Sequence, residues 1–242
     1  MRHICICKEL NLASILSQFA PLTLSPDAAV DFHMHTTYSD GRYSAPQLLD
    51  LLVEEGFQLV AVTDHDRVDR VAEIQALAAE RGLPVLAGVE MSTEWNGKMG
   101  HMLCYGFDPE QNELLAITED VRRMKEAGHR GVKSDMARTV EAAHKSGAVC
   151  LIAHPGRREH NFTFYDPALL DQLRQEIPID GIEVYHPYHS PEIIEVYLKY
   201  VQEHDLLYST GSDTHCVAGR MPIKYKAEIS RKLLERLGVN IS

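Results

Sequence analysis

Histidines and carboxylates recur in short motifs, and each motif follows a run of apolar residues. The motifs are His33-Met34-His35, Thr63-Asp64-His65, Gly88-Val89-Glu90, Ala153-His154 and Asp213-Thr214-His215. Imidazoles and carboxylates are common ligands of zinc and other transition metals. Taken singly, each motif has an ordinary explanation, such as a chance His-x-His pair or a turn capped by Asp. Their recurrence at the ends of strand-like runs instead predicts one shared metal-binding pocket.

The elements that must position these motifs follow a parallel β/α pattern, because strand-length apolar runs alternate with helix-length amphipathic stretches. We expect strands at Ala29 to His33, Leu59 to Thr63, Val85 to Val89, Ala148 to Ala153, Gly181 to Tyr185 and Leu206 to Thr210. Helix starts are indicated by a Ser44/Gln47 capping box and by Asp166-Pro167 and Ser190-Pro191. Active sites of β/α barrels lie at the C-terminal ends of the strands, so the motifs should meet at one rim.

One connection, from Glu90 to His101, is too short for a helical crossover. Asn96-Gly97 within it is a strong signal for a two-residue hairpin turn. The turn predicts that Trp95 faces Lys98 and that Ser92 faces His101. Glu90 then becomes the diagonal neighbour of His101, which is close enough for both to serve one metal centre.

Composition limits the class of protein. The formal net charge of -11 disfavours a stable partnership with long nucleic acids, whose phosphates attract clustered basic residues. No apolar run approaches the roughly 20 residues that span a bilayer, so we expect no membrane association. The five cysteines lack CxxC spacing, and we expect reduced thiols in a cytoplasmic protein. Residues Met1 to Leu24 lack a signal-peptide pattern. Residues 1–28 are interpreted as an N-terminal extension, with one catalytic domain at residues 29–242.

The ordered motif set resembles the PHP family, the polymerase and histidinol phosphatase superfamily of metal-dependent phosphoesterases. The resemblance spans roughly Asp31 to His215 and also includes Ser39-Asp40-Gly41, His101 and His154-Pro155-Gly156. It implies a distorted, TIM-like β/α barrel with seven strands and a site for three metal ions. By resemblance, His33, His35, Glu90 and Asp213 hold a first ion, Glu90 bridges to a second held by His101 and His154, and Asp40, His65 and His215 hold the third.

The expected chemistry is hydrolysis of a phosphate monoester of a small molecule by a metal-bridged hydroxide. Mixed histidine and carboxylate ligation suits Zn, Mn or Fe better than Mg. The chain looks closest to stand-alone family members that dephosphorylate nucleotides, which implies a nucleotide or nucleoside bisphosphate substrate.

Two further residues are candidates for contacts with the substrate. Arg157 should project into the pocket mouth, where a guanidinium fits phosphate oxygens; the alternative is a surface ion pair with Glu159. His189, like His186, follows a strand end and is a candidate for orienting the substrate or protonating the leaving group. The alternative for both histidines is an ordinary loop position.

Three other functions stay open. Histidinol phosphate is an alternative substrate. An amidohydrolase-type enzyme that cleaves a C-N bond also begins with His-x-His and ends with Asp on a β/α barrel, but it would usually use a bridging lysine. A non-catalytic, metal-binding accessory domain of a polymerase is the third. Such a domain would be expected to have lost ligands, whereas every ligand position is filled in this sequence.

Overall fold

The computed structural model describes residues 22–158, 162–217 and 220–242. Its strands are β1 (Thr23–Leu24), β2 (Ala29–Asp31), β3 (Leu59–Ala61), β4 (Val85–Leu86), β5 (Gly88–Trp95), β6 (Lys98–Tyr105), β7 (Ser134–Asp135), β8 (Val149–Ile152), β9 (Gly181–Tyr185), β10 (Leu207–Thr210), β11 (Tyr225–Lys226) and β12 (Asn240–Ile241). Its helices are α2 (Ala45–Glu54), α3 (Val71–Ala79), α4 (Leu114–Glu126), α5 (Met136–Lys145), α6 (Pro167–Glu176), α7 (Pro191–Glu203) and α8 (Arg231–Arg236), with short 3₁₀ turns η1 (Val68–Arg70) and η2 (Ala227–Ser230). This alternation confirms the α/β class.

The strands form mixed sheets. A six-stranded sheet has the order β10-β9-β8-β6-β5-β7, a four-stranded sheet has the order β11-β2-β3-β4, and β1 pairs with β12. Neighbours β8, β9 and β10 run parallel, as do β2, β3 and β4. Strand β6 is antiparallel to both β5 and β8.

The two larger sheets meet at two seams. At one, the Phe32 N–H donates to the Thr210 carbonyl at 3.2 Å, and at the other the Glu90 N–H donates to the Thr63 carbonyl at 3.1 Å. Pairing at each seam continues as an isolated parallel bridge, Met34 with Thr214 at one and His65 with Glu90 at the other, and no longer ladder forms among the described residues. A closed seven-stranded barrel is therefore not confirmed among the described residues, although the strand ends gather as expected.

The predicted third strand is divided between the sheets. Val85 and Leu86 pair with β3, whereas β5 begins at Gly88 and belongs to the six-stranded sheet. A Cβ at Gly88 would lie 3.1 Å from the Thr63 side chain and 3.2 Å from that of Tyr105. The close approach of backbone to side chains at this crossing explains why a glycine occupies the switch.

The hairpin prediction is confirmed in its register. Trp95 pairs with Lys98 and Ser92 with His101 across β5 and β6. Asn96 and Gly97 have φ values of 49° and 72°, the left-handed conformation that a tight turn of this kind requires.

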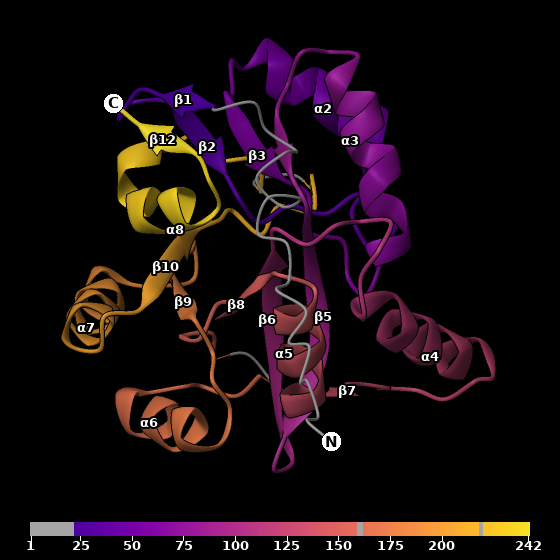
Figure 1. Cartoon of the computed structure of the whole chain (residues 1–242), viewed down its shortest axis with the longest axis vertical. Helices are drawn as coiled ribbons and strands as arrows, with labels where there is room; N and C mark the ends of the chain where they lie inside the picture. Colours follow the sequence, from indigo (N-terminus) through magenta and orange to yellow (C-terminus); the bar gives the residue numbers. More distant parts are fainter. Residues whose placement is uncertain (1–21, 159–161, 218–219) are drawn as a thin grey trace, which may run out of the picture.

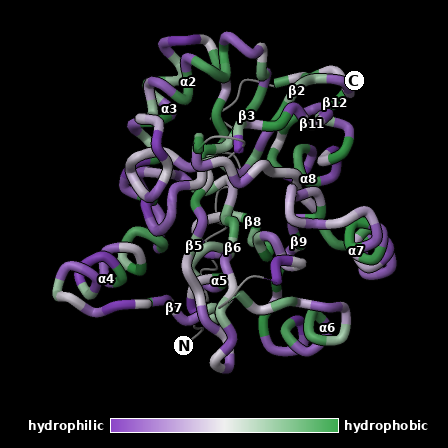
Figure 2. Tube along the Cα trace, turned by 180° about the vertical axis from the view of Figure 1, so that it is seen from behind, coloured by the Kyte–Doolittle hydropathy of each residue, from purple (hydrophilic) through white to green (hydrophobic). Residues whose placement is uncertain are grey.

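The predicted helix starts are also confirmed. Ser44 and Gln47 form a capping box, Asp166 accepts a hydrogen bond from the Leu169 N–H, and Ser190 accepts one from the Ile193 N–H. Helices α5, α6 and α7 lie along the six-stranded sheet, while α2 and α3 lie beside the four-stranded sheet (Figure 1). In Figure 2, α7 is hydrophobic toward the strands and hydrophilic on its outer side, as amphipathic helices on a sheet are.

The boundary predicted after residue 28 stays a prediction. Of the predicted extension, Thr23 and Leu24 pair with Asn240 and Ile241, and the Leu24 side chain is buried. Residues 1–21 lie outside the described part. Among the described helices, none combines the length and apolar character that crossing a membrane would demand.

Candidate metal centre

Four predicted ligands converge as a buried group, which we call the floor: His33, His35, Glu90 and Asp213. His33 Nε2 lies 2.9 Å from Glu90 Oε2 and 3.6 Å from Asp213 Oδ1. His35 Nε2 lies 3.1 Å and 3.2 Å from the same two oxygens. His33 and His35 share a side because they are two apart in an extended segment. Residues from three distant segments therefore point at one position.

The second oxygen of Glu90 faces a different pair of histidines. Glu90 Oε1 lies 2.8 Å from His101 Nδ1 and 3.0 Å from His154 Nε2. The contact between Glu90 and His101 is the diagonal one predicted from the hairpin. The two carboxylate oxygens of Glu90 thus face two separate histidine groups, which is the geometry that a bridging carboxylate needs.

Asp40, His65 and His215 form a third group, the outer group, next to His35. Asp40 Oδ2 lies 3.2 Å from His215 Nε2 and 3.8 Å from His65 Nε2, while Asp40 Oδ1 lies 3.8 Å from His35 Nδ1. His65 Nδ1 is also 3.3 Å from Glu90 Oε2. All of the predicted ligands are therefore brought together.

The donor set fits divalent metal ions. Three overlapping groups have ligand atoms within 4.8 Å of one another: His33, His35, Glu90 and Asp213; His35, Asp40, His65 and His215; and His65, Glu90 and His101. Both ring nitrogens of His35 and Nδ1 of His65 are buried without a well-formed hydrogen bond. Buried nitrogens of this kind normally have partners, so their orientation toward carboxylates fits shared cations.

The pKa values show how strongly these charges interact. Burial is the largest influence on His35 and favours its neutral form, but the carboxylates of Asp213 and Glu90 outweigh burial and raise its pKa to about 9. Burial also opposes ionisation of Glu90, yet the surrounding His33, His65 and His101 hold its pKa well below the usual value. For His154, burial dominates and lowers the pKa to about 4. Its neutral imidazole is the form that binds a metal.

Two buried carboxylates that were not predicted support the floor. Glu183 Oε1 lies 3.0 Å from His33 Nδ1, and its other oxygen accepts the His154 N–H at 2.8 Å. Asp31 accepts the N–H groups of Ser212 and Ile223, each at 3.0 Å. Glu183 thereby fixes the tautomer and orientation of the His33 imidazole, while Asp31 holds the main chain on both sides of the centre. The sequence did contain a signal for Asp31, because an acidic residue inside an apolar strand is unusual and Asp31 shares the strand face of His33.

Two of the ligands adopt left-handed backbone conformations. The φ values are 31° at His154 and 49° at Asp213. Residues other than glycine rarely adopt such values. At both positions the chain leaves a strand, β8 or β10, so the turn directs each side chain back toward Glu90 and His33.

A cavity of about 240 Å³ is lined by ligands of all three groups, including Asp40, Glu90 and His154. Its wall also contains Arg157, Phe162 and Arg220. Arg157 Nη1 is 3.7 Å from Asp213 Oδ2, and Arg220 Nη2 is 3.3 Å from the same oxygen. The Arg157 guanidinium also lies 4.0 Å from the centre of the Phe162 ring. Arg157 thus lies in the wall of this cavity, and Arg220 is an additional cation there that no motif indicated. Glu159, the alternative partner of Arg157, lies outside the described residues.

His189 has a different place from the one predicted. Its Nδ1–H donates to the Val184 carbonyl at 2.8 Å, and its Nε2 accepts the Gly156 N–H at 3.0 Å. Both ring nitrogens are thus engaged by the main chain, and neither is available to protonate a leaving group. The geometry instead makes His189 a support of the loop after His154. His186 lies nearer the centre, with Nε2 3.4 Å from Asp213 Oδ2.

Comparisons with known proteins identify the family of the chain. The profile of the PHP domain matches residues 31–239. A 3',5'-nucleoside bisphosphate phosphatase from Chromobacterium violaceum is 28% identical, over 78% of this chain and 87% of its own length. A 5'-3' exoribonuclease from Haemophilus influenzae is 31% identical, but over 40% of this chain and 35% of its own length.

Solved structures show the same fold. A chain from Bifidobacterium adolescentis superimposes with a TM-score of 0.73 at 20% identity, covering 90% of this chain and 99% of that one. An amidohydrolase from Chromobacterium violaceum superimposes with a TM-score of 0.71 at 23% identity, covering 86% and 97%. With the profile match over most of the sequence and the converging ligand set, the chain belongs to the PHP domain family of metal-dependent phosphoesterases.

Proposed function

We propose that this protein hydrolyses a phosphate monoester of a small molecule, with three divalent ions of Zn, Mn or Fe type held by the floor, by His101 and His154, and by the outer group. The observation that carries the proposal is that the two carboxylate oxygens of Glu90 face different histidine groups. Glu90 Oε2 lies 2.9 Å from His33 Nε2, and Glu90 Oε1 lies 2.8 Å from His101 Nδ1. When bound, the ions supply a nucleophile from water near neutral pH and neutralise charge on the phosphoryl group.

The chain's own residues orient the ions and the substrate. Glu183 holds the Nδ1 side of His33, which leaves Nε2 directed at the centre. Arg157 and Arg220 place two guanidinium groups beside Asp213 at the cavity wall. Planar guanidinium groups bind phosphate oxygens in pairs, so we assign them to a phosphate of the substrate.

Aromatic rings extend this binding surface. Tyr188 is partly exposed and lies 5.1 Å from the Arg157 guanidinium and 5.0 Å from that of Arg220. A ring beside two cations provides a flat surface for a base and adjacent charge for a phosphate. This arrangement, and the name of the Chromobacterium violaceum relative, support a nucleoside bisphosphate as the substrate.

We also propose a cytoplasmic location. Cys104, Cys150 and Cys216 are free thiols, which is the state that cytosolic reductants maintain.

A substrate panel tests the proposal. Metal-depleted protein would be supplied with Mn²⁺ or Zn²⁺ and assayed for released phosphate with adenosine 3',5'-bisphosphate, adenosine monophosphates and histidinol phosphate, and for amine release with simple amides. We expect the bisphosphate to give the highest kcat/KM. No phosphate release from any ester would contradict the proposal, and cleavage of amides alone would favour the amidohydrolase alternative. Glu90→Gln protein is the control for contaminating phosphatases.

A further inference from the structure

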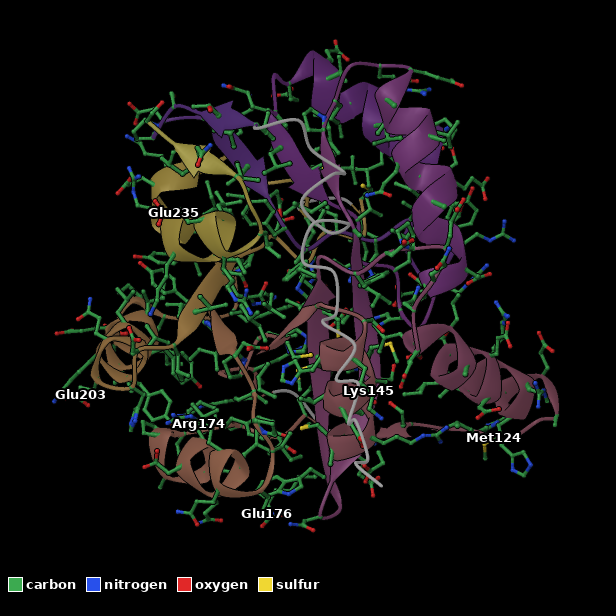
Figure 3. The ribbon with its side chains drawn as sticks, in the orientation of Figure 1. Met124, Lys145, Arg174, Glu176, Glu203 and Glu235 are labelled. Atoms are coloured by element: carbon green, nitrogen blue, oxygen red, sulfur yellow. The ribbon has the colours of Figure 1, made fainter. Side chains whose placement is uncertain are left out.

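A second group of metal-binding side chains lies between strand β8 and helix α5, separate from the centre described above. It consists of His144 near the end of α5, Cys150 in β8 and Asp180 immediately before β9. Their ligand atoms all lie within 4.8 Å of one another. Lys145, labelled in Figure 3, marks the end of α5 beside His144.

A second thiol adjoins this group. Cys104 in β6 is the direct cross-strand partner of Cys150 in β8, and their sulfur atoms are 3.7 Å apart. This separation allows a hydrogen bond between the two thiols. Cys104 is not within 4.8 Å of every ligand atom of the group, so it borders the group and is not one of its ligands.

The main chain holds this group in place. The Asp180 N–H donates to the Cys150 carbonyl at 2.9 Å, and the Cys150 N–H donates to Asp180 Oδ2 at 2.7 Å. His144 Nε2 lies 2.8 Å from that same oxygen. The spacing is close to the 2.9 Å between His33 Nε2 and Glu90 Oε2 at the first centre, so the two centres share one kind of histidine–carboxylate geometry.

Burial differs across this group. Both cysteines are fully buried, whereas the side chains of His144 and Asp180 are 33% and 26% exposed. The imidazole and the carboxylate therefore lie on the solvent side, and the sulfurs lie on the core side. The Cys104 thiol and burial raise the pKa of Cys150 well above its usual value, so without an ion the Cys150 thiol stays protonated and unreactive.

We propose that His144, Cys150 and Asp180 form a second metal site, which binds one divalent ion of zinc type. Binding releases the proton of the Cys150 thiol, and the His144 imidazole coordinates through Nε2 with its remaining proton on Nδ1. One thiolate, one imidazole and one carboxylate are ligand types that zinc accepts, and they leave a fourth position for water. The ion would join α5, β8 and the start of β9. The inference does not depend on the proposed phosphatase activity.

Cobalt spectroscopy of the full chain distinguishes the two centres. Co²⁺ added to metal-depleted protein gives a near-ultraviolet charge-transfer band only where a thiolate is a ligand, and the first centre contains no cysteine among its predicted ligands. We expect the band to grow as Co²⁺ is added and to stop growing when this site holds one Co²⁺ in each chain. Added Zn²⁺ should displace the Co²⁺ and remove the band. Cys104→Ala should leave the band in place, since it removes a thiol outside the three-residue ligand group.

Matched variants locate the source of the band. Cys150→Ala should abolish it, while Cys216→Ala, which removes a buried cysteine elsewhere, should leave it unchanged. His144→Ala changes a partly exposed residue, so folding is expected to persist while Co²⁺ affinity at this site falls roughly tenfold or more. The proposal is overturned if saturating Co²⁺ gives no band, or if the band survives in Cys150→Ala and disappears in a Cys5→Ala/Cys7→Ala variant.

Discussion

The floor and the outer group of the first centre use the same residue types in different surroundings. The side chains of His33, His35 and Glu90 are 0% exposed and that of Asp213 is 2% exposed. In the outer group, Asp40 is 56% exposed, His65 20% and His215 18%. One group is enclosed by the fold, and the other faces the cavity.

The difference separates two tasks. The floor is held by buried partners such as Glu183, so its geometry exists before any ion arrives. Asp40 lies on a loop and approaches its histidines at 3.2 to 3.8 Å, so an ion there would be reached directly from solvent. We infer that the floor determines whether the centre forms, and that the outer group adjusts how it meets the substrate.

The largest expected effect is that of Glu90→Gln. The amide cannot bridge two cations as a carboxylate does, and loss of about 4 kcal/mol of charge stabilisation corresponds to roughly 10³-fold in rate. Phosphate release and bound metal per chain, measured by elemental analysis, should both fall. Glu195→Gln on the exposed face of α7 is the matched control and should retain both. A Glu90→Gln enzyme with full metal content and near-normal kcat would contradict the inference that the floor determines whether the centre forms.

Asp40→Asn should have a smaller effect, on the order of 10²-fold or less in kcat/KM, since an exposed carboxylate contributes less than a buried one. Bound metal should fall by at most one ion per chain, with the floor still loaded. If this variant lost as much metal and activity as Glu90→Gln, the distinction between the two groups would be wrong.

Proton release tests the state of the floor. Because the pKa of His35 is raised to about 9, this imidazole is protonated in metal-free protein at pH 7 and must lose its proton to bind a metal. Metal affinity should therefore weaken roughly tenfold per pH unit for this one proton as pH falls below 9, and the dependence on His35 should vanish above it. Calorimetry in two buffers of different ionisation enthalpy measures the release. Identical heats of metal binding in both buffers would contradict the release of a proton from His35.

Arg220→Ala should have the smallest effect, several-fold in KM for a bisphosphate with little change in kcat, as expected when an exposed phosphate contact is removed. Arg236→Ala, an exposed position at the end of α8, is the control. An equal loss with monophosphate and bisphosphate substrates would show that Arg220 does not recognise the second phosphate.

Much of this centre could be predicted from sequence because strand ends of a β/α fold gather at one edge, and the hairpin register followed from Asn96 and Gly97. The division of the predicted third strand at Gly88 could not be predicted, because it depends on the Thr63 and Tyr105 side chains that crowd Gly88. Glu183 and the backbone partners of His189 were missed for a similar reason. Such contacts join segments far apart in the chain, and no local pattern records them.

The left-handed backbone at His154 and Asp213 bears on how this protein tolerates mutation. Holding a non-glycine residue in that conformation costs of order 1–3 kcal/mol at each position, and glycine relieves it without a steric penalty. His154→Gly and Asp213→Gly should thus destabilise the metal-free fold less than the matching alanine changes, while removing a ligand just as completely. Selection for activity and selection for a robust fold therefore act in opposite directions at this rim.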